Sequence, residues 1–341
     1  MKIPIFNKLN KKIGIDLGSS RIRIWVDGSG VVLDEPSCIA FDTKNKTVLA
    51  VGTEAVEMDG RVASHITVMY PIMNGEIYDI AALSTLVKIL LGKAAGTIAL
   101  YNPIIMASIP VEATQADREV TTQVLHSFGA GEVYTIAQPL AASIGSGVPI
   151  ADASGSFVVY LGAGIVEGVI ISLGSIIVSQ SSEYAGEYLT NAIQVFVQKN
   201  FGLIISKSTA NKIKKKVISL DLNDQREHLI AGQDALDESP KELLIKSKDF
   251  ADFTLSYLEK IESIVVELLS KMPPELAVDV IDKGLLLTGG TAQILGIEAY
   301  FTQKLGIPVS VVDEPGTAVI KGIGQALENL DLFKQSLGYQ E

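Results

Sequence analysis

Three glycine-containing segments carry the residues of this sequence that could bind a phosphate. Residues 13–20 form an apolar strand that ends in Asp16-Leu17-Gly18 and two serines. A tight glycine turn lets backbone N–H groups and hydroxyls point at a phosphate, and a carboxylate at the strand end can hold a water on Mg²⁺. A similar strand and glycine turn return at residues 159–164, so two such loops facing one another could hold a polyphosphate.

The third segment, residues 284–296, is an apolar strand followed by a glycine turn that opens a helix. Gly289 and Gly290 would allow a flat base or a phosphate to approach the backbone closely. Each signal is weak alone, because any hairpin can contain such a turn. Together, in this order and spacing, the three favour a polyphosphate site.

Two similar sets of elements must position these loops. A strand, a glycine turn, a second strand and a hairpin begin at Ile13 and again at Val158, and further strands and a helix follow each set. This layout indicates a duplicated α/β domain with a cleft between its halves. The length of 341 residues agrees with two lobes.

Hydrophobic periodicity predicts the elements in more detail. We expect helices at residues 79–91, 114–128, 140–146, 187–201, 208–217, 249–271, 293–305 and 317–330. We expect strands at residues 12–17, 22–26, 31–34, 37–42, 48–51, 104–109, 133–136, 156–161, 165–173, 176–182, 284–288 and 309–312, with two more within 220–247.

Residues 157–178 are almost wholly apolar and long enough to cross a bilayer. Glu167 and four glycines interrupt this stretch, and valine, isoleucine and serine dominate the rest. We therefore expect two or three buried strands joined by tight turns, and not a membrane helix.

The composition excludes several classes of protein. Apolar residues make up 48% and charged residues 20%, which rules out disorder as the dominant state. The net charge of −11 argues against nucleic-acid partners, which need a positive surface. A single cysteine, Cys38, excludes a disulfide framework, and three scattered histidines argue against a histidine-bound metal.

The first twelve residues hold four lysines and no acidic residue, and Ile5, Phe6 and Leu9 could share one side of a helical turn. Basic residues are attracted to anionic lipid, so this segment could be a membrane contact. The alternative is a solvated lead-in to the first strand. The absence of a signal-peptide pattern indicates a cytoplasmic location.

Taken together, these segments resemble the actin/Hsp70/sugar-kinase superfamily and, within it, the MreB family of bacterial actins. The resemblance covers nearly the whole chain. It rests on residues 16–18, 33–37, 70–72 with Gly75, 108–110, 138–145, 171–174, 201–204, 209–210, 273–277 and 287–290.

The resemblance implies an α/β, actin-like fold: two duplicated lobes, each a five-stranded sheet with flanking helices and a small subdomain, around a nucleotide cleft. It implies subdomain IA at residues 1–32, 66–145 and 315–341, IB at 33–65, IIA at 146–182 and 248–314, and IIB at 183–247. It also implies an ATP-dependent filament, a homopolymer of antiparallel double protofilaments. Its expected location is cytoplasmic and peripheral at the inner face of the cell membrane, with paralogous filament proteins as further partners.

The resemblance also implies ATP and Mg²⁺ as cofactors. It assigns catalytic roles to Gln138 and Asp16, with Asp16 facing the metal. The nucleotide-binding residues that it implies are Gly18, Ser19, Ser20, Arg21, Gly162, Ala163, Gly164, Gly186, Glu187, Lys207, Asn211, Gly289, Gly290 and Thr291.

Two departures from the family pattern bear on hydrolysis. Where the family begins its second phosphate loop with Asp, this chain has Tyr160, and Ile165 and Val166 replace two threonines. The family's Glu before Pro-x-Ala-Ala is Gln138 here. A glutamate can accept a proton from attacking water, whereas a glutamine can only orient it. We therefore expect weak ATP hydrolysis.

Other departures leave nucleotide binding through backbone loops possible. The family's Asn in the first loop is Arg21, a cation that could lie near phosphate or point away. Where the family has Thr-Ala-Glu, this chain has Asn211 in place of the glutamate. Where the family has Gly-Gly-Asp, this chain has Ala-Gly-Glu at residues 185–187. This pattern resembles the divergent paralogues of wall-less, helical, swimming bacteria, whose filaments shape or bend the cell.

Two alternatives remain. The chain could be a nucleotide-insensitive filament scaffold or a regulator of an active paralogue, because the altered loops could fail to hold Mg-ATP. It could also be a small-molecule kinase of the same superfamily. The kinase is disfavoured because sugar kinases are generally longer and no Asp base presents itself here.

Overall fold

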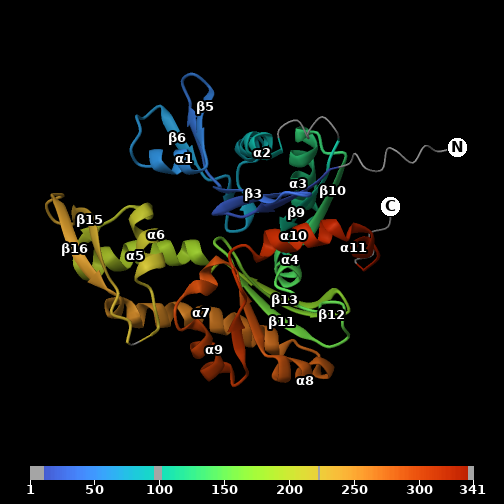
Figure 1. Ribbon diagram of the computed structural model, residues 1–341. Coiled ribbons are helices and arrows are strands. Elements are labelled where there is room, and N and C mark those ends of the chain that lie inside the picture. The colour runs from blue at the N-terminus through green and yellow to red at the C-terminus, as the bar shows by residue number, and fades with distance from the viewer. Residues whose placement is uncertain (1–10, 96–101, 222, 337–341) are drawn as a thin grey trace. The chain divides into compact units, whose positions relative to one another are not determined.

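The computed structural model describes residues 11–95, 102–221 and 223–336, and the chain divides into two compact units (Figure 1). Unit 1 comprises Met1–Ser154, Ile171–Ile177 and Gly316–Glu341. Unit 2 comprises Gly155–Ile170 and Val178–Pro315.

The sheet of unit 1 has the strand order β10-β9-β1-β2-β3. β1, β2 and β3 form an antiparallel meander, while β9 runs parallel to β1 and β10 runs parallel to β9. Every residue of β1 from Ile13 to Leu17 is buried, as expected for a strand that is covered on both faces. The strands are β1 (Lys12–Leu17), β2 (Arg21–Val26), β3 (Gly30–Pro36), β9 (Ile104–Ile109) and β10 (Glu132–Ala137).

The other elements of unit 1 include a small sheet of order β5-β4-β6 and a two-stranded β7-β8 hairpin. Thr114 caps α3 in a capping box with Asp117, and Gly129 ends that helix in the left-handed conformation. The elements are β4 (Ile39–Asp42), β5 (Thr47–Val51), α1 (Thr53–Met58), β6 (Ile66–Met69), β7 (Ile72–Met73), β8 (Glu76–Ile77), α2 (Ile80–Ala95), α3 (Gln115–Phe128), α4 (Gln138–Gly145), α10 (Ala318–Glu328) and α11 (Leu330–Ser336).

Helices α4 and α10 lie side by side through glycine contacts (Figure 1). A Cβ atom on Gly145 would lie 2.0 Å from the carbonyl oxygen of Ala318, and one on Gly322 would lie 1.7 Å from that of Ala141. Only glycine permits this approach. The contact fixes α4, whose first residue is Gln138.

The sheet of unit 2 has the order β13-β12-β11-β17-β18, and a smaller sheet has the order β14-β15-β16. The elements are β11 (Ser156–Leu161), β12 (Val166–Ser172), β13 (Ser175–Ser182), α5 (Gly186–Phe201), β14 (Leu203–Ile204), α6 (Lys207–Lys216), β15 (Glu227–Asp234), β16 (Pro240–Lys246), η3 (Ser247–Phe250), α7 (Ala251–Ser270), α8 (Pro274–Lys283), β17 (Leu285–Thr288), η4 (Gly290–Gln293), α9 (Ile297–Leu305) and β18 (Val309–Val311).

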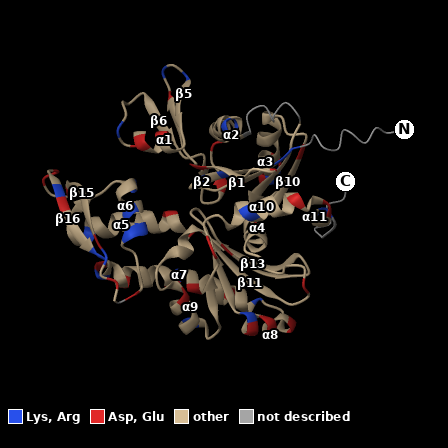
Figure 2. Cartoon of the chain, viewed as in Figure 1, with Lys and Arg blue, Asp and Glu red and all other residues tan. Residues whose placement is uncertain are grey.

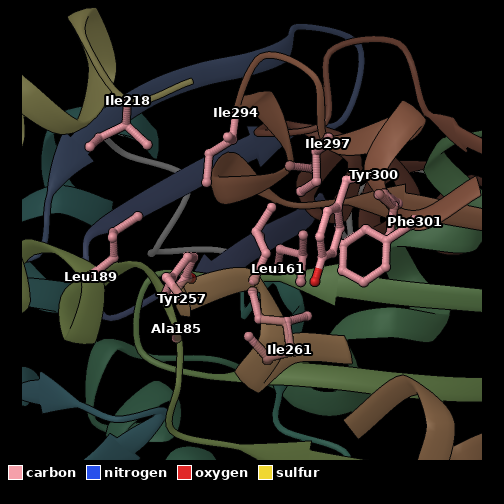
Figure 3. Close-up of a cluster of buried hydrophobic side chains, with 14 of the residues drawn as sticks. Leu161, Ala185, Leu189, Ile218, Tyr257, Ile261, Ile294, Ile297, Tyr300 and Phe301 are labelled. Atoms are coloured by element: carbon pink, nitrogen blue, oxygen red, sulfur yellow. The ribbon is translucent and has the colours of Figure 1, made fainter. Parts of the chain in front are cut away.

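One hydrophobic core joins the elements of unit 2 (Figure 3). Leu161 at the end of β11, Leu189 of α5 and Ile261 of α7 are each fully buried in it. This core holds the start of α5 near the end of β11, where the second glycine loop begins.

The two large sheets have equivalent strand orders. Three strands that are consecutive in sequence form one side of each sheet, and two later strands continue it from the first of the three. This equivalence confirms the repeat that the sequence predicts. The apolar stretch at residues 157–178 forms strands, and no helix among the described residues has both the length and the apolar character needed to cross a membrane.

One predicted helix was wrong in detail, and one helix was missed. Residues 293–305 do not form one helix, because Gly296 adopts a left-handed conformation with φ 87° and separates η4 from α9. We predicted no element at residues 274–283, where the structure has α8, which begins at Pro274 because proline fits the first turn of a helix.

Candidate functional site

Three polar side chains lie at the carboxyl ends of neighbouring strands in unit 1. The parallel register pairs Ile15 of β1 with Ala107 of β9, so Asp16 and Ser108 follow at the same level. Gln138 comes directly after β10, the next strand in the sheet. Ligands of open α/β sheets bind at this edge.

Asp16 is held by two neighbours. The hydroxyl of Ser108 donates to its Oδ1 at 2.8 Å and accepts the N–H of Leu17 at 3.1 Å. An Arg23 NH1 group lies 3.3 Å from Oδ2. Burial raises the pKa of Asp16, and the Arg23 guanidinium opposes that rise. Both carboxylate oxygens therefore already have partners within unit 1.

The first glycine loop is fixed by its own backbone. The N–H of Gly18 donates to the carbonyl of Arg21 at 3.1 Å, and a Cβ atom on Gly18 would lie 2.8 Å from the same oxygen. Ser19 is buried and accepts the N–H of Gly75 at 3.1 Å, while Ser20 is exposed. Of the two serines, Ser20 presents its side chain to solvent.

Arg21 folds onto Asp34 of the neighbouring strand β3. Its Nε contacts the Asp34 carboxylate, and its NH2 donates to the Asp34 carbonyl at 2.7 Å. The same carboxylate lies 3.3 Å from Nε of Arg23. Two arginines and two aspartates thus form a continuous chain: Arg21, Asp34, Arg23 and Asp16.

Gln138 is buried, with 3% of its surface exposed. Its Oε1 accepts no hydrogen bond from the residues that the structure describes. Buried polar atoms nearly always have a partner, so this oxygen is available to a water or a ligand. A carboxamide at this place can orient a water molecule but cannot take its proton.

In unit 2, the second and third glycine loops and the start of α5 form one hydrogen-bonded group. The N–H groups of Gly186 and Glu187 donate to the carbonyls of Gly162 and Ala163 at 3.0 and 2.7 Å. The hydroxyl of Thr291 also donates to the Gly162 carbonyl, at 3.0 Å. A Cβ atom on Gly186 would lie 2.6 Å from that hydroxyl oxygen, so the packing requires glycine.

The third loop meets the same edge of the sheet, because β11 and β17 are parallel and adjacent. Gly289 has φ 88°, and a Cβ atom there would lie 2.4 Å from the carbonyl oxygen of Leu161. Gly290 is exposed with open space at its Cβ position, and Gly164 is buried. Gly290 therefore leaves room for a ligand to approach the backbone.

A lysine of α6 holds the start of α5. The Nζ of Lys214 donates to the carbonyl of Gly186 at 2.7 Å and to Oγ1 of Thr190 at 2.8 Å. The Thr190 hydroxyl in turn donates to Oδ1 of Asn211 at 3.0 Å. Asn211 is thereby placed beside the amino end of α5.

The charges around this group influence one another. Burial lowers the pKa of Lys214 to about 8, and the nearby Glu187 carboxylate opposes the shift. Burial also raises the pKa of Glu187, which Lys207 and Lys214 oppose. In Figure 2 part of the α6 ribbon has the blue of Lys and Arg, and the last turn of this helix holds Lys214, Lys215 and Lys216. A cationic group therefore lies near the start of α5.

Arg23 and Lys214 were not singled out in the sequence, and Ser108 was named there only within residues 108–110 and without a role. Opposite charges at positions 16 and 23, across a short turn, could have revealed Arg23, since they face each other in the register. Lys214 begins a run of three lysines, which is more often a solvated helix face.

The family model for the MreB/Mbl protein matches residues 10–335. The chain belongs to the MreB/Mbl family. It is 33% identical to the cell shape-determining protein MreB of Escherichia coli (strain K12) over 335 residues, 96% of each chain. It is 32% identical to the cell shape-determining protein Mbl of Bacillus subtilis (strain 168) over 322 residues, 94% of this chain and 97% of Mbl.

Solved structures agree with membership of the MreB/Mbl family. The crystal structure of MreB5 of Spiroplasma citri bound to AMPPNP is similar with a TM-score of 0.91 and 30% identity, covering 96% of this chain and 98% of that one. The structure of MreB5 bound to ADP gives a TM-score of 0.90. The predicted family and the actin-like fold are confirmed.

The donors in this MreB/Mbl chain do not fit the Mg²⁺ ion that the family resemblance implies. Mg²⁺ takes carboxylate and water oxygens in near-ideal octahedral geometry. Asp16 already binds Ser108 and Arg23. In the second loop Tyr160 stands where the family has a carboxylate, and its ring lies against Gly162, 2.7 Å from where a Cβ atom would be. Mg²⁺ at Asp16 therefore stays a prediction of the sequence that this geometry disfavours.

The predicted membrane contact at Ile5, Phe6 and Leu9 lies outside the described residues.

The predicted nucleotide-binding residues fall into two groups in this MreB/Mbl chain. Those of unit 1 lie around Asp16, and those of unit 2 lie around Gly162 and the start of α5. Within each unit, residues far apart in sequence are brought together.

Proposed function

We propose that this protein is a cytoskeletal actin homologue that binds ATP through its glycine loops and polymerises into filaments that determine cell shape or motility. The observation that carries the proposal is the group in unit 2, where Thr291, Gly186 and Glu187 hold the second glycine loop. Loops built from backbone amides and small hydroxyls suit phosphate. Membership of the MreB/Mbl family and the likeness to MreB5, which was solved with AMPPNP and with ADP, support the same ligand.

We assign the phosphates to the loops around Gly18 and Gly162, with Ser20 as the exposed hydroxyl. We assign the adenosine to the loop at Gly290 and to Lys207 and Asn211 of α6, which lie near the start of α5. Gly290 suits this role because nothing lies within 4 Å of its Cβ position. The Mg²⁺ ion is left out of this assignment, because both oxygens of Asp16 are engaged.

We expect slow hydrolysis. The free Oε1 of Gln138 can accept a hydrogen bond from a water and so orient it for attack on a phosphate. No proton transfer to Gln138 follows, because a carboxamide is not a base at neutral pH. General base catalysis contributes about 10²–10⁴-fold to the rate of a reaction where it operates. Its absence here should slow hydrolysis by about that factor, while nucleotide binding does not depend on it.

The filament is expected to be a homopolymer of antiparallel double protofilaments at the inner face of the cell membrane. Ile5, Phe6 and Leu9 are the proposed membrane contacts, beside the lysines of the first twelve residues. Paralogous filament proteins are further proposed partners. The membrane contact can be tested by flotation with anionic and neutral vesicles. Phe6→Asp should reduce flotation with anionic vesicles, and equal flotation of both proteins would contradict the assignment.

Sedimentation tests the central proposal. The purified protein is pelleted without nucleotide, with ATP and with AMPPNP, and phosphate is measured in the same tubes. Pelleting that needs ATP or AMPPNP, with little phosphate released, supports the proposal. Brisk phosphate release would show that Gln138 and Asp16 suffice for turnover.

A second candidate is a nucleotide-insensitive scaffold or a regulator of an active paralogue. The ring of Tyr160 against Gly162 favours it, because the ring takes up space beside the second phosphate loop. Pelleting of the same extent in all three conditions, with no nucleotide bound by calorimetry, would support the scaffold instead.

A further inference from the structure

We propose that this protein binds ATP without requiring a divalent cation, because Arg23 already supplies the positive charge at Asp16. The inference rests on the proposed nucleotide binding and adds a statement about its cation. It follows from the charged chain Arg21, Asp34, Arg23 and Asp16 described above.

The position of Arg23 is set by the strand register. Asp16 and Arg23 face each other across the antiparallel pair of β1 and β2. Their side chains are only 3% and 14% exposed, and NH1 of Arg23 lies 3.3 Å from Oδ2 of Asp16. The Arg23 guanidinium is largely shielded from solvent and lies against both Asp16 and Asp34, which hold it beside the Asp16 carboxylate.

The second oxygen of Asp16 is committed as well. Ser108 donates to Oδ1 at 2.8 Å, and its own hydroxyl oxygen accepts the N–H of Leu17 at 3.1 Å. The Ser108 hydroxyl therefore uses its hydrogen for Asp16 and is held in place by the N–H of Leu17. Asp16 therefore offers a metal no oxygen that is free of a protein partner.

Charge leads to the same conclusion. Arg23 is also 3.3 Å from the Asp34 carboxylate, which Arg21 contacts too, so two cations and two anions balance. A divalent ion beside Asp16 would lie next to a guanidinium in a poorly solvated place, where like charges repel strongly. Among the described residues, no group of three or more His, Cys, Asp or Glu side chains offers an alternative metal site.

The second phosphate loop offers no carboxylate that could hold a metal in place of Asp16. Tyr160 is the last but one residue of β11, and its phenol is a weak ligand for Mg²⁺ compared with a carboxylate. The negative charge of the triphosphate would instead meet backbone N–H groups and fixed cations. The charges around Asp16 are already balanced, so the cations that remain for the triphosphate are Lys207 and Lys214 near the start of α5. With them, we expect free ATP to bind about as well as Mg-ATP.

Calorimetry on the full chain decides the matter. ATP is titrated into the protein in EDTA and, separately, in excess MgCl₂. We expect dissociation constants within about threefold of each other, whereas a requirement for metal would appear as at least about tenfold tighter binding with MgCl₂. Tighter binding with MgCl₂ would overturn this inference but leave the proposed ATP binding intact. A lack of ATP binding in both buffers would overturn the proposed function and this inference with it.

Arg23→Met tests whether the Arg23 guanidinium is the reason that ATP binding needs no divalent cation. Without the guanidinium, Asp16 gains a free oxygen, and ATP affinity should rise about tenfold or more on adding MgCl₂. Arg61→Met removes an exposed arginine from the same unit and should keep the behaviour of the natural protein. An Arg23→Met protein that folds, by circular dichroism, and binds ATP equally in both buffers would contradict the role of Arg23. If Arg23→Met does not fold, the comparison of the two buffers with the natural protein still decides the inference.

Discussion

The hydroxyl of Thr291 donates to the carbonyl of Gly162 across 3.0 Å and so joins two loops that are 129 residues apart in sequence. The same carbonyl accepts the N–H of Gly186, which begins α5. One oxygen atom thereby holds the second glycine loop, the third glycine loop and a helix start in a fixed arrangement. Both donors are buried, so water cannot easily replace either bond.

Replacing Thr291 with valine should loosen this arrangement with little change of shape. The buried Gly162 carbonyl loses one donor, which costs about 1 kcal/mol of stability. We expect ATP to bind up to about fivefold more weakly, because 1 kcal/mol is a factor of about five when the whole loss falls on the loops. Denaturant unfolding and calorimetry measure the two effects. Thr291→Ser keeps the hydroxyl and is the matched control. Equal ATP affinity in Thr291→Val and the natural protein would contradict the proposed role of the loops.

Gln138→Glu should raise ATP hydrolysis, because a carboxylate can accept the proton of the attacking water. The expected gain in phosphate release is about 10²-fold. Phosphate release is measured under the conditions in which the protein pellets with ATP. Gln303→Glu introduces the same change at an exposed place in α9 and is the control. Unchanged release in a Gln138→Glu protein that still binds ATP would show that Gln138 does not face the attacking water.

The fold was largely predictable from sequence. Glycine turns and alternating apolar runs identified the strands around Asp16 and Tyr160, and the repeat that begins at Ile13 and Val158 predicted two equivalent sheets. The error at residues 293–305 has a cause that lies outside that segment. Gly296 breaks a helical pattern only because it takes a left-handed conformation against Leu220, which depends on tertiary packing.

The site was less predictable, because the partners of each residue come from distant segments. Composition and spacing indicate that Asp16 ends a strand, but they do not reveal that Ser108, 92 residues away, binds its Oδ1. Lys214 looks like one of several solvated lysines in α6. Its contact with Gly186 depends on how α5 and α6 pack, and no local pattern encodes that packing.

Gly322→Ala should strongly destabilise unit 1. Its Cβ atom would lie 1.7 Å from the carbonyl oxygen of Ala141, so α4 and α10 must separate. Overpacking of this kind costs about 1–3 kcal/mol or more. Because Gln138 begins α4, phosphate release should also fall. Gly92→Ala is the matched control in α2, where nothing lies within 4 Å of the Cβ position. This control should be neutral or more stable by about 0.5–1 kcal/mol. Similar stability of both variants would be inconsistent with the close helix contact.

Lys214 should make stability depend on pH in the alkaline range. Its pKa is about 8 in the folded protein and near its ordinary value of 10.5 in the unfolded chain. Below pH 8 both states hold the proton, so Lys214 contributes no slope and its burial penalty is fully present. Between pH 8 and 10.5 the unfolded chain binds more protons, so the unfolding free energy rises with pH, by roughly 1–3 kcal/mol in total. Urea unfolding at pH 7, 8.5 and 10 measures this rise for the natural protein and for Lys214→Met, which should lack it. Lys212→Met, an exposed lysine on the same helix, should keep it. A rise of the same size in Lys214→Met would assign the pH dependence to other groups.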